Sequence, residues 1–399
     1  MTRSRLLGVL GSLYLAQGLP FGFFTQALPV MLRKQHVSLE LIGLISLLAL
    51  PWALKFLLAP TVDRRGTRRA WVLAMQAATV VTLVLAAGLE ASATGPLLAV
   101  IAVINALAAT QDIATDALAV DLLQRAERGI ANGLQVGAYR VGMIIGGGAL
   151  LVVFDVVGWR GSFIIMAGLV AATTVPVLRL REPPRTAGPG ASLEGFFARP
   201  DAWPLLALLF SFKFGEAFGV GMLRPRLVDL GYGLAELGVM VGTVGFAAGL
   251  VGAFAGGAWV GRLGRRRALL IFGAAQTAAV LGYSTIGFDA PRALVAVAIA
   301  LEHLCSGLAT ATLFTCIMDW SRAEASATDS TVQASTVVVA TGQATALSGL
   351  SAAKLGYPLH FGLASLFAAG AVIVAGVLFP RITQQEAPVP SDSASGVGA

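Results

Sequence analysis

The chain has 399 residues, of which 56% are hydrophobic and 12% are charged, and its mean hydropathy is +0.80. Soluble domains carry about twice that charged fraction, roughly 25%. The composition therefore excludes a soluble globular protein and predicts one that has lipid as its solvent. A membrane-spanning helix needs about 20 apolar residues and takes roughly 33 with a short connection, so the chain has room for about twelve spans.

The net charge of +7 comes from lysines and arginines that are distributed unevenly. Sorted by the helices expected below, 18 of the 28 fall on one side of the membrane and 7 on the other. The remaining three, Lys55, Arg140 and Lys213, lie inside expected spans. This positive-inside bias argues against a nucleic-acid partner. It predicts that both termini lie in the cytoplasm, and the Lys-poor, Arg- and Ala-rich composition favours a bacterial inner membrane.

Hydropathy predicts an all-α membrane protein with twelve helices in two sets of six. The first set is expected at 6–32, 41–60, 70–90, 96–121, 131–155 and 161–180, and the second at 203–226, 237–260, 268–287, 293–319, 331–352 and 360–380. A polar connection rich in proline, glycine and arginine separates the sets. We therefore expect an N-terminal half (1–180), a cytoplasmic linker (181–202), a C-terminal half (203–380) and a disordered tail (381–399).

Marker residues of the first half recur in the second half at an offset of 198 positions. The pairs that share this offset are Gly66 and Gly264, Asp121 and Asp319, and Gln135 and Gln333. A repeat of this length indicates that the two halves are related copies. Parallel halves related by an axis along the membrane normal are the arrangement of major facilitator transporters.

The loop after the second expected helix reads Asp63-Arg-Arg-Gly-Thr-Arg-Arg69 and resembles the signature loop of the major facilitator superfamily, with Ala59 in place of the usual first glycine. A carboxylate at this position can accept hydrogen bonds from a helix N-terminus of the other half and pair with an arginine. We therefore expect Asp63 to latch the outward-facing state. In the second copy Gly261 replaces the acid, so no latch is expected there. The gating residues that the loop and the repeated acids indicate are Asp63, Arg64, Gly66, Arg68, Arg69, Asp121 and Asp319, with Arg125 and Arg322 near the last two.

Several stretches resemble one branch of the superfamily. The segments 14–22 (YLAQGLPFG), 50–60 (LPWALKFLLAP) and 109–116 (ATQDIATD) are similar to AmpG-type muropeptide permeases and the related acetyl-coenzyme A transporters. The segments 318–322 and 327–335 look closer to RhtX/FptX-type siderophore importers. The resemblance implies an importer that works by alternating access. It favours a siderophore or its iron complex as the substrate, with anhydro-muropeptides as the alternative.

Charged side chains inside spans cost at least about 2.5–3.5 kcal/mol each, so those that occur are candidates for binding substrate or protons. Asp112 and Asp116 lie one turn apart on a helix. Repulsion between their carboxylates favours retention of a proton on one of them, which would allow proton exchange during transport. Alternatively, Lys55 or Arg140 neutralises both acids and the cluster only holds helices together.

The second half holds two further candidates. Lys213 and Glu216 are three residues apart and are expected to neutralise each other. Glu302 and His303 are adjacent, so on a helix they point about 100° apart, and His303 can titrate near neutral pH. The complete set of candidate residues for substrate binding and proton coupling is Asp112, Asp116, Lys55, Arg140, Gln17, Glu216, Glu302 and His303.

Motifs of other function classes are missing from the sequence. It has no G-x-x-x-x-G-K-[ST] for an ATP-driven pump and no H-E-x-x-H, and its three histidines are too scattered for a metal site. A membrane-embedded enzyme would need a nucleophile–base or metal cluster, and a non-transporting sensor would need a soluble output domain. We therefore expect no catalytic site, no metal, no cofactor and no nucleotide, and a monomer driven by the proton gradient.

Overall fold

The computed structural model describes residues 3–23, 50–90, 94–182, 191–287 and 289–383. These parts of the chain are almost entirely helical and contain no strand, as the sequence predicts. Eight of the described helices are long and apolar enough to cross a membrane. They cover Arg68–Ala87, Gly95–Leu122, Val156–Leu178, Ala202–Asp229, Gly238–Leu263, Arg265–Thr285, Arg292–Trp320 and Tyr357–Ile382.

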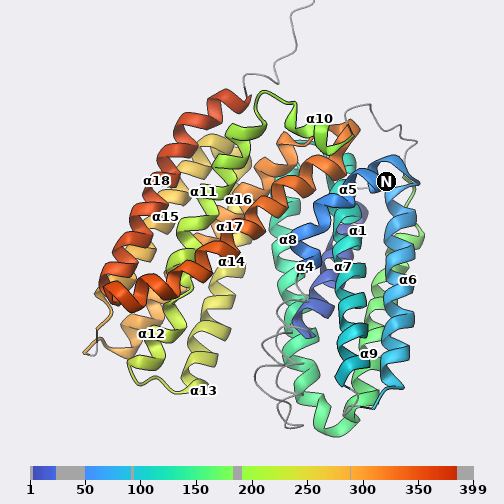
Figure 1. The fold of residues 1–399 in the computed structure, drawn as a ribbon, viewed down its shortest axis with the longest axis horizontal. Coiled ribbons are helices and arrows are strands. Elements are labelled where there is room, and N and C mark those ends of the chain that lie inside the picture. Colours follow the sequence, from blue (N-terminus) through green and yellow to red (C-terminus); the bar gives the residue numbers. More distant parts are fainter. Residues whose placement is uncertain (1–2, 24–49, 91–93, 183–190, 288, 384–399) are drawn as a thin grey trace, which may run out of the picture.

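The helices of the N-terminal part form one group, coloured blue to green in Figure 1. Its members are α1 (Arg3–Gly22), α4 (Leu50–Leu54), η3 (Lys55–Leu57), α5 (Ala59–Arg64), α6 (Arg68–Ala87), α7 (Thr94–Leu122), α8 (Arg128–Met143), the π-helical η4 (Ile144–Ala149) and α9 (Leu150–Leu178). Gly158 breaks α9 with a φ of 66°, which glycine adopts without a steric penalty. The break lies between the expected helices 131–155 and 161–180, so α9 contributes to both.

The remaining helices form a second group, coloured yellow-green to red in Figure 1. Its members are α10 (Leu193–Phe197), α11 (Ala202–Val220), α12 (Leu223–Asp229), α13 (Leu234–Leu237), the π-helical η5 (Gly238–Gly245), α14 (Phe246–Leu263), α15 (Arg265–Gly282), η6 (Tyr283–Thr285), α16 (Arg292–Trp320), η7 (Ala323–Ala325), α17 (Ser326–Leu355) and α18 (Tyr357–Thr383). Counted through the interruptions, the described helices are consistent with twelve spans.

Three expected boundaries are wrong. The connection 181–202 contains α10, because Phe196 is apolar and buries its side chain fully. The helix expected at 331–352 begins already at Ser326, for a reason given below. The helix expected to end at 380 continues to Thr383, because Ile382 is fully buried, so the tail cannot begin at 381. The expected segments 24–32 and 41–49, and the chain beyond 383, lie outside the described residues.

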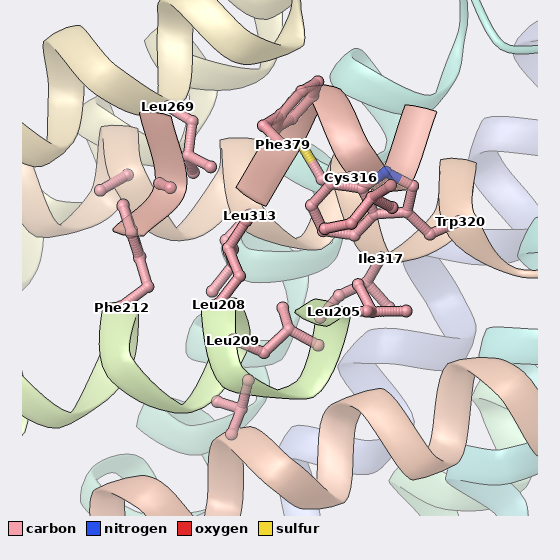
Figure 2. Packing of buried hydrophobic residues seen from close by; sticks show 14 of the residues in the cluster. Leu205, Leu208, Leu209, Phe212, Leu269, Leu313, Cys316, Ile317, Trp320 and Phe379 are labelled. Atoms are coloured by element: carbon pink, nitrogen blue, oxygen red, sulfur yellow. The ribbon is translucent and has the colours of Figure 1, made fainter. Parts of the chain in front are cut away.

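Apolar side chains fill the interior of each group. In the first group α1 packs on α8, and α6 packs on α7 and α9. In the second group α11 packs on α17 and α18, and α15 packs on α16 and α18. Figure 2 shows the largest buried cluster, to which α11, α15, α16 and α18 contribute Leu205, Leu208, Leu209, Phe212, Leu269, Leu313, Cys316, Ile317, Trp320 and Phe379.

Candidate functional site

Asp63 joins the two groups of helices at the end of the molecule where α5 and α10 lie (Figure 1). Its carboxylate accepts hydrogen bonds from the backbone N–H of Ala327 (3.2 Å) and of Thr328 (2.8 Å) and from the Thr328 hydroxyl (2.6 Å). It also pairs with Arg68, and both side chains are buried. α17 has no cap from its own preceding residue, Ala325. A carboxylate of the other group therefore satisfies the first-turn N–H groups of α17, which explains why this helix starts earlier than expected.

Arg64, Gly66 and Arg69 hold the signature loop in place. Gly66 turns the chain with a φ of 67°. Arg64 donates to the Ala191 carbonyl (3.0 Å), and Arg69 donates to the carbonyls of Val177 (3.2 Å) and Leu178 (2.9 Å). These contacts fix the loop between α5 and α6, so that Asp63 is held in place against α17.

Asp319 forms a second connection between the groups. It lies near the end of α16, is almost fully buried, and receives Arg265 Nε at 2.7 Å, Arg128 Nη1 at 3.0 Å and Arg125 Nε at 3.4 Å. Arg125 and Arg128 belong to the first group, whereas Arg265 starts α15 in the second copy of the loop. Gly261 supplies no acid in the second copy of the loop, but Arg265 of this copy pairs with Asp319, which the two arginines of the first group also reach. We call the end that holds Asp63 and Asp319 the joined end.

Two more acids lie at the joined end. Asp121 lies 3.5 Å from Arg68 Nε. Asp329, which sequence reasoning missed, is fully buried and pairs with Arg199 (2.8 Å) and Arg322 (2.8 Å). Arg322 was expected beside Asp319. Hydrogen bonds to Asp329 raise the pKa of Arg322 above its usual value, so this arginine keeps its charge at any physiological pH.

A buried polar cluster lies inside the first group. Lys55 pairs with Asp112, and both are buried. Asp116, one turn further along α7, accepts hydrogen bonds from the Tyr14 hydroxyl (3.2 Å) and from Gln135 Nε2 (3.4 Å). The alternative interpretation names Lys55 or Arg140 as the cation that neutralises both acids. In the structure Lys55 pairs with Asp112. The two acids differ in their surroundings. Asp112 forms an ion pair with a cation, whereas Asp116 accepts hydrogen bonds from neutral groups.

Asp116 also faces the second group. It lines a small cavity of about 10 Å³ together with Gln135 of α8 and with residues of α16 and α17, among them Phe314 and Ser330. This volume is close to the minimum that one water molecule needs. The carboxyl group of Asp116 thus lies next to the surface along which the two groups meet.

Arg140 extends from α8 into the second group instead of toward the Asp112 cluster. Its guanidinium donates to the Phe246 carbonyl (3.5 Å) and lies 5.2 Å from the centre of the Phe246 ring. Space for it comes from Gly249, where a Cβ would lie 2.2 Å from Arg140 Nη1. The expected pairing of Arg140 with the acids of α7 is therefore replaced by a contact between the groups.

The remaining candidates lie within the helices that the sequence indicates. Lys213 pairs with Glu216, which also accepts from Ser306, and Lys213 contacts Thr310 Oγ1 at 3.1 Å. The predicted self-neutralising pair is therefore formed.

Glu302 is almost fully buried and accepts from the Tyr283 hydroxyl (3.3 Å), and His303 Nδ1 lies 3.0 Å from it and 3.0 Å from the Ile299 carbonyl. Gln17 is buried in α1, and its Nε2 has no hydrogen-bond partner in the described part of the chain.

Glycines allow the closest approach of the two groups near the joined end. A Cβ added to Gly257 of α14 would lie 2.3 Å from the carbonyl oxygen of Gly129 on α8. We expect Gly257→Ala to force α8 and α14 apart at a cost of about 1–3 kcal/mol, which lowers the midpoint of thermal unfolding of the purified protein. Gly261→Ala is the matched control, because a Cβ at Gly261 on the same helix meets nothing within 4 Å. Equal midpoints for both variants would contradict this description of the contact.

These features together define a class of protein. Membrane-spanning helices in two groups, buried charges along their contact and ion pairs that join them at one end are typical of a membrane transporter. Asp63 narrows this class of protein further, because it follows the second expected span and caps α17 of the other group.

The chain belongs to the major facilitator superfamily, whose family model matches residues 10–342 and again 229–396. The anhydromuropeptide permease of Escherichia coli K12 is 34% identical over 343 residues, which is 82% of this chain and 69% of that protein. A Rickettsia felis protein named as an AmpG transporter is 27% identical over 326 residues, 75% of this chain and 78% of its own. The chain is thus an AmpG-like member of the superfamily.

Solved structures show the same fold at low identity. The transporter FucP in its outward conformation superposes with a TM-score of 0.75 at 15% identity, over 93% of this chain and 98% of its own. A bacterial homologue of the iron transporter ferroportin in the outward-facing state gives a TM-score of 0.66 at 17% identity, over 96% of this chain and all of its own. These similarities establish the major facilitator fold.

Proposed function

We propose that the protein imports anhydro-muropeptides across the inner membrane and couples this import to protons. The choice of substrate rests on the 34% identity to the Escherichia coli anhydromuropeptide permease over 82% of the chain. This relative supports the alternative drawn from the sequence, whereas no comparison supports the siderophore that the sequence analysis favours. A muropeptide is a sugar joined to a short peptide, so it presents carboxylates and an amine to the buried charges of both groups.

The joined end faces the cytoplasm in this proposal. The signature loop, the α14–α15 connection and Arg199 place many arginines there, and arginine-rich connections are retained on the cytoplasmic side. In this proposal the contacts of Asp63 and Asp319 close the cytoplasmic end, as expected of the outward-facing state of the alternating-access cycle. Release of these contacts would open the path to the cytoplasm.

Reporter fusions test this orientation. A fusion after Ser192, in the connection at the joined end, is expected to report a cytoplasmic location. A fusion after Asp289, in the connection before α16, is expected to report a periplasmic one. The opposite pair of results would reverse the proposed orientation in the membrane and would place the joined end in the periplasm.

Asp116 is the proton carrier in this proposal. Asp112 is paired with the Lys55 ammonium, and breaking a buried ion pair costs about 3–5 kcal/mol. Asp116 accepts hydrogen bonds only from the neutral groups Tyr14 and Gln135 in the described part of the chain, so its protonated form avoids the cost of a buried unpaired charge.

Uptake by cells tests the function. A strain that lacks its own muropeptide permease is given this protein, and entry of a radiolabelled anhydro-muropeptide is compared with entry of a labelled ferric siderophore. The proposal expects muropeptide uptake well above that of the empty strain and no increase for the siderophore. Siderophore uptake without muropeptide uptake would overturn it.

A further inference from the structure

A hollow lined by arginines lies at the joined end, where α14 ends and α15 begins. Its volume is about 950 Å³. Its lining residues other than alanine and glycine are four arginines and two apolar residues. They are Arg125, Arg265, Arg266, Arg267, Leu263 and Phe379. The wall thus combines strong positive charge with an apolar surface and contains no acidic residue.

The corresponding loop of the first group contains its own anion. Glu182 accepts hydrogen bonds from the backbone N–H of Arg68 (3.0 Å) and of Arg69 (2.8 Å) at the start of α6. Thr67 caps the same helix by accepting from the N–H of Ala70 (3.1 Å). Because a helix N-terminus carries partial positive charge, a carboxylate of the protein compensates both the helix and its arginines there.

The loop before α15 has no such compensation. At the 198-residue offset, Thr67 corresponds to Arg265 and Glu182 to Pro380, and α15 starts without a side-chain cap. Arg266 donates to a backbone carbonyl, that of Gly376 (3.0 Å). Arg267 is exposed and makes neither a hydrogen bond nor an ion pair within the described residues.

Asp319 does not neutralise the hollow. It is already shared by Arg125, Arg128 and Arg265, so three cations face one carboxylate. Adding Arg266 and Arg267 leaves a large excess of positive charge in and beside the hollow. A multiply hydrogen-bonded anion from outside the chain would balance it.

The hollow lies at the expected level of lipid headgroups. One candidate span ends at Leu263 and the next begins at Arg265. Trp259, one turn before Leu263 on α14, exposes 52% of its surface, and exposed tryptophans at span ends are typical of the membrane interface. Leu263 and Phe379 offer an apolar wall beside the arginines.

We propose that the hollow binds the phosphate headgroup of an anionic phospholipid. The lipid provides at α15 the negative charge that Glu182 provides at α6. Guanidinium groups pair with phosphate oxygens through two parallel hydrogen bonds, and the apolar wall accommodates the upper part of an acyl chain. This inference requires a membrane around the helices but does not depend on the transported substrate.

Binding of lipid to the full-length protein tests the proposal. The purified protein in detergent is titrated with phosphatidylglycerol or with phosphatidylcholine of the same chains, and retained lipid is counted by native mass spectrometry. Phosphatidylglycerol is expected to bind at least tenfold more tightly than phosphatidylcholine. The double variant Arg266→Gln with Arg267→Gln is expected to lose this preference. The matched control, Arg160→Gln with Arg224→Gln, removes the same charge from exposed arginines at the other end of the helices and is expected to keep it.

A second variant leaves every arginine in place. Pro380→Glu puts a carboxylate at the position that corresponds to Glu182 and is expected to weaken phosphatidylglycerol binding about as much as the double variant. Unchanged thermal unfolding in phosphatidylcholine shows that the variants are folded.

Four results would overturn the proposal. The first three are equal binding of both lipids, wild-type binding by the double variant, and displacement of lipid by low millimolar inorganic phosphate, which would mean that a free anion is the ligand. Tighter lipid binding after Glu386→Gln with Asp392→Asn would assign the hollow to the chain's own C-terminal carboxylates and would also overturn it.

Discussion

Asp63→Asn is expected to lower muropeptide uptake at least tenfold while expression and folding persist. The substitution keeps the size of the side chain and removes the charge that Arg68 and the first turn of α17 share. Hydrogen bonds to charged groups contribute about 1.5–3 kcal/mol each, so their weakening shifts the equilibrium between the two transport states by about tenfold or more.

Labelling of a cysteine separates loss of the latch from loss of folding. In a variant without Cys305 and Cys316, a cysteine at Ser330, which is buried between the groups, is expected to react slowly with a maleimide from the cytoplasmic side. Asp63→Asn should speed this reaction severalfold. Asp229→Asn, a carboxylate bonded to the Tyr357 hydroxyl at the other end, is the matched control and should leave it unchanged. Slow labelling and normal uptake in Asp63→Asn would reduce this residue to a determinant of topology.

Asp116→Asn is expected to abolish accumulation of substrate against a gradient while exchange of pre-loaded substrate survives. Exchange needs the conformational change but no net movement of protons, and Tyr14 and Gln135 are neutral, so the variant leaves no buried charge unpaired. The measurement compares accumulation driven by a pH gradient with exchange at equal pH in the same vesicles. Normal accumulation with wild-type pH dependence would make Asp116 structural and would move the search for the proton site to Glu216, Glu302 or His303.

Asp112→Asn should behave differently, because it leaves the Lys55 ammonium buried without its partner. We expect a loss of thermal stability equivalent to about 3–5 kcal/mol. Adding Lys55→Met should restore the stability without restoring full accumulation. Equal stability of Asp112→Asn and wild type would contradict the ion pair as described.

The sequence predicts those parts of the fold and site that depend on local pattern. Long apolar runs predict the helices, and the resemblance of the loop at Asp63 to the superfamily's signature motif implies that this acid meets an arginine and a helix N-terminus of the other half. The spacing of Lys213 and Glu216 likewise predicts their pair. The pair of Lys213 and Glu216 can be predicted without knowing which helices are neighbours. The contacts of Asp63 can be predicted from the arrangement of helices that the signature motif implies.

Contacts between distant helices could not be predicted in the same way. Periodicity places Arg140 on a face of its helix but does not say that Gly249 of the other group leaves room for it. Asp329 is not among the candidate residues because the expected helix begins at 331, whereas α17 begins at Ser326 and Asp329 lies in its first turn, where it pairs with Arg199 and Arg322. The pair between Arg265 and Asp319 joins α15 to α16, and spacing along the chain does not indicate that these two residues meet.

Proton-driven transport of a muropeptide by the purified protein tests the central claim most directly. The protein is reconstituted into liposomes, and labelled anhydro-muropeptide is supplied with and without an imposed pH gradient. We expect accumulation above the external concentration only when the gradient is present, and loss of that accumulation in Asp116→Asn. Equal uptake with and without the gradient, or accumulation of a ferric siderophore in place of the muropeptide, would contradict it.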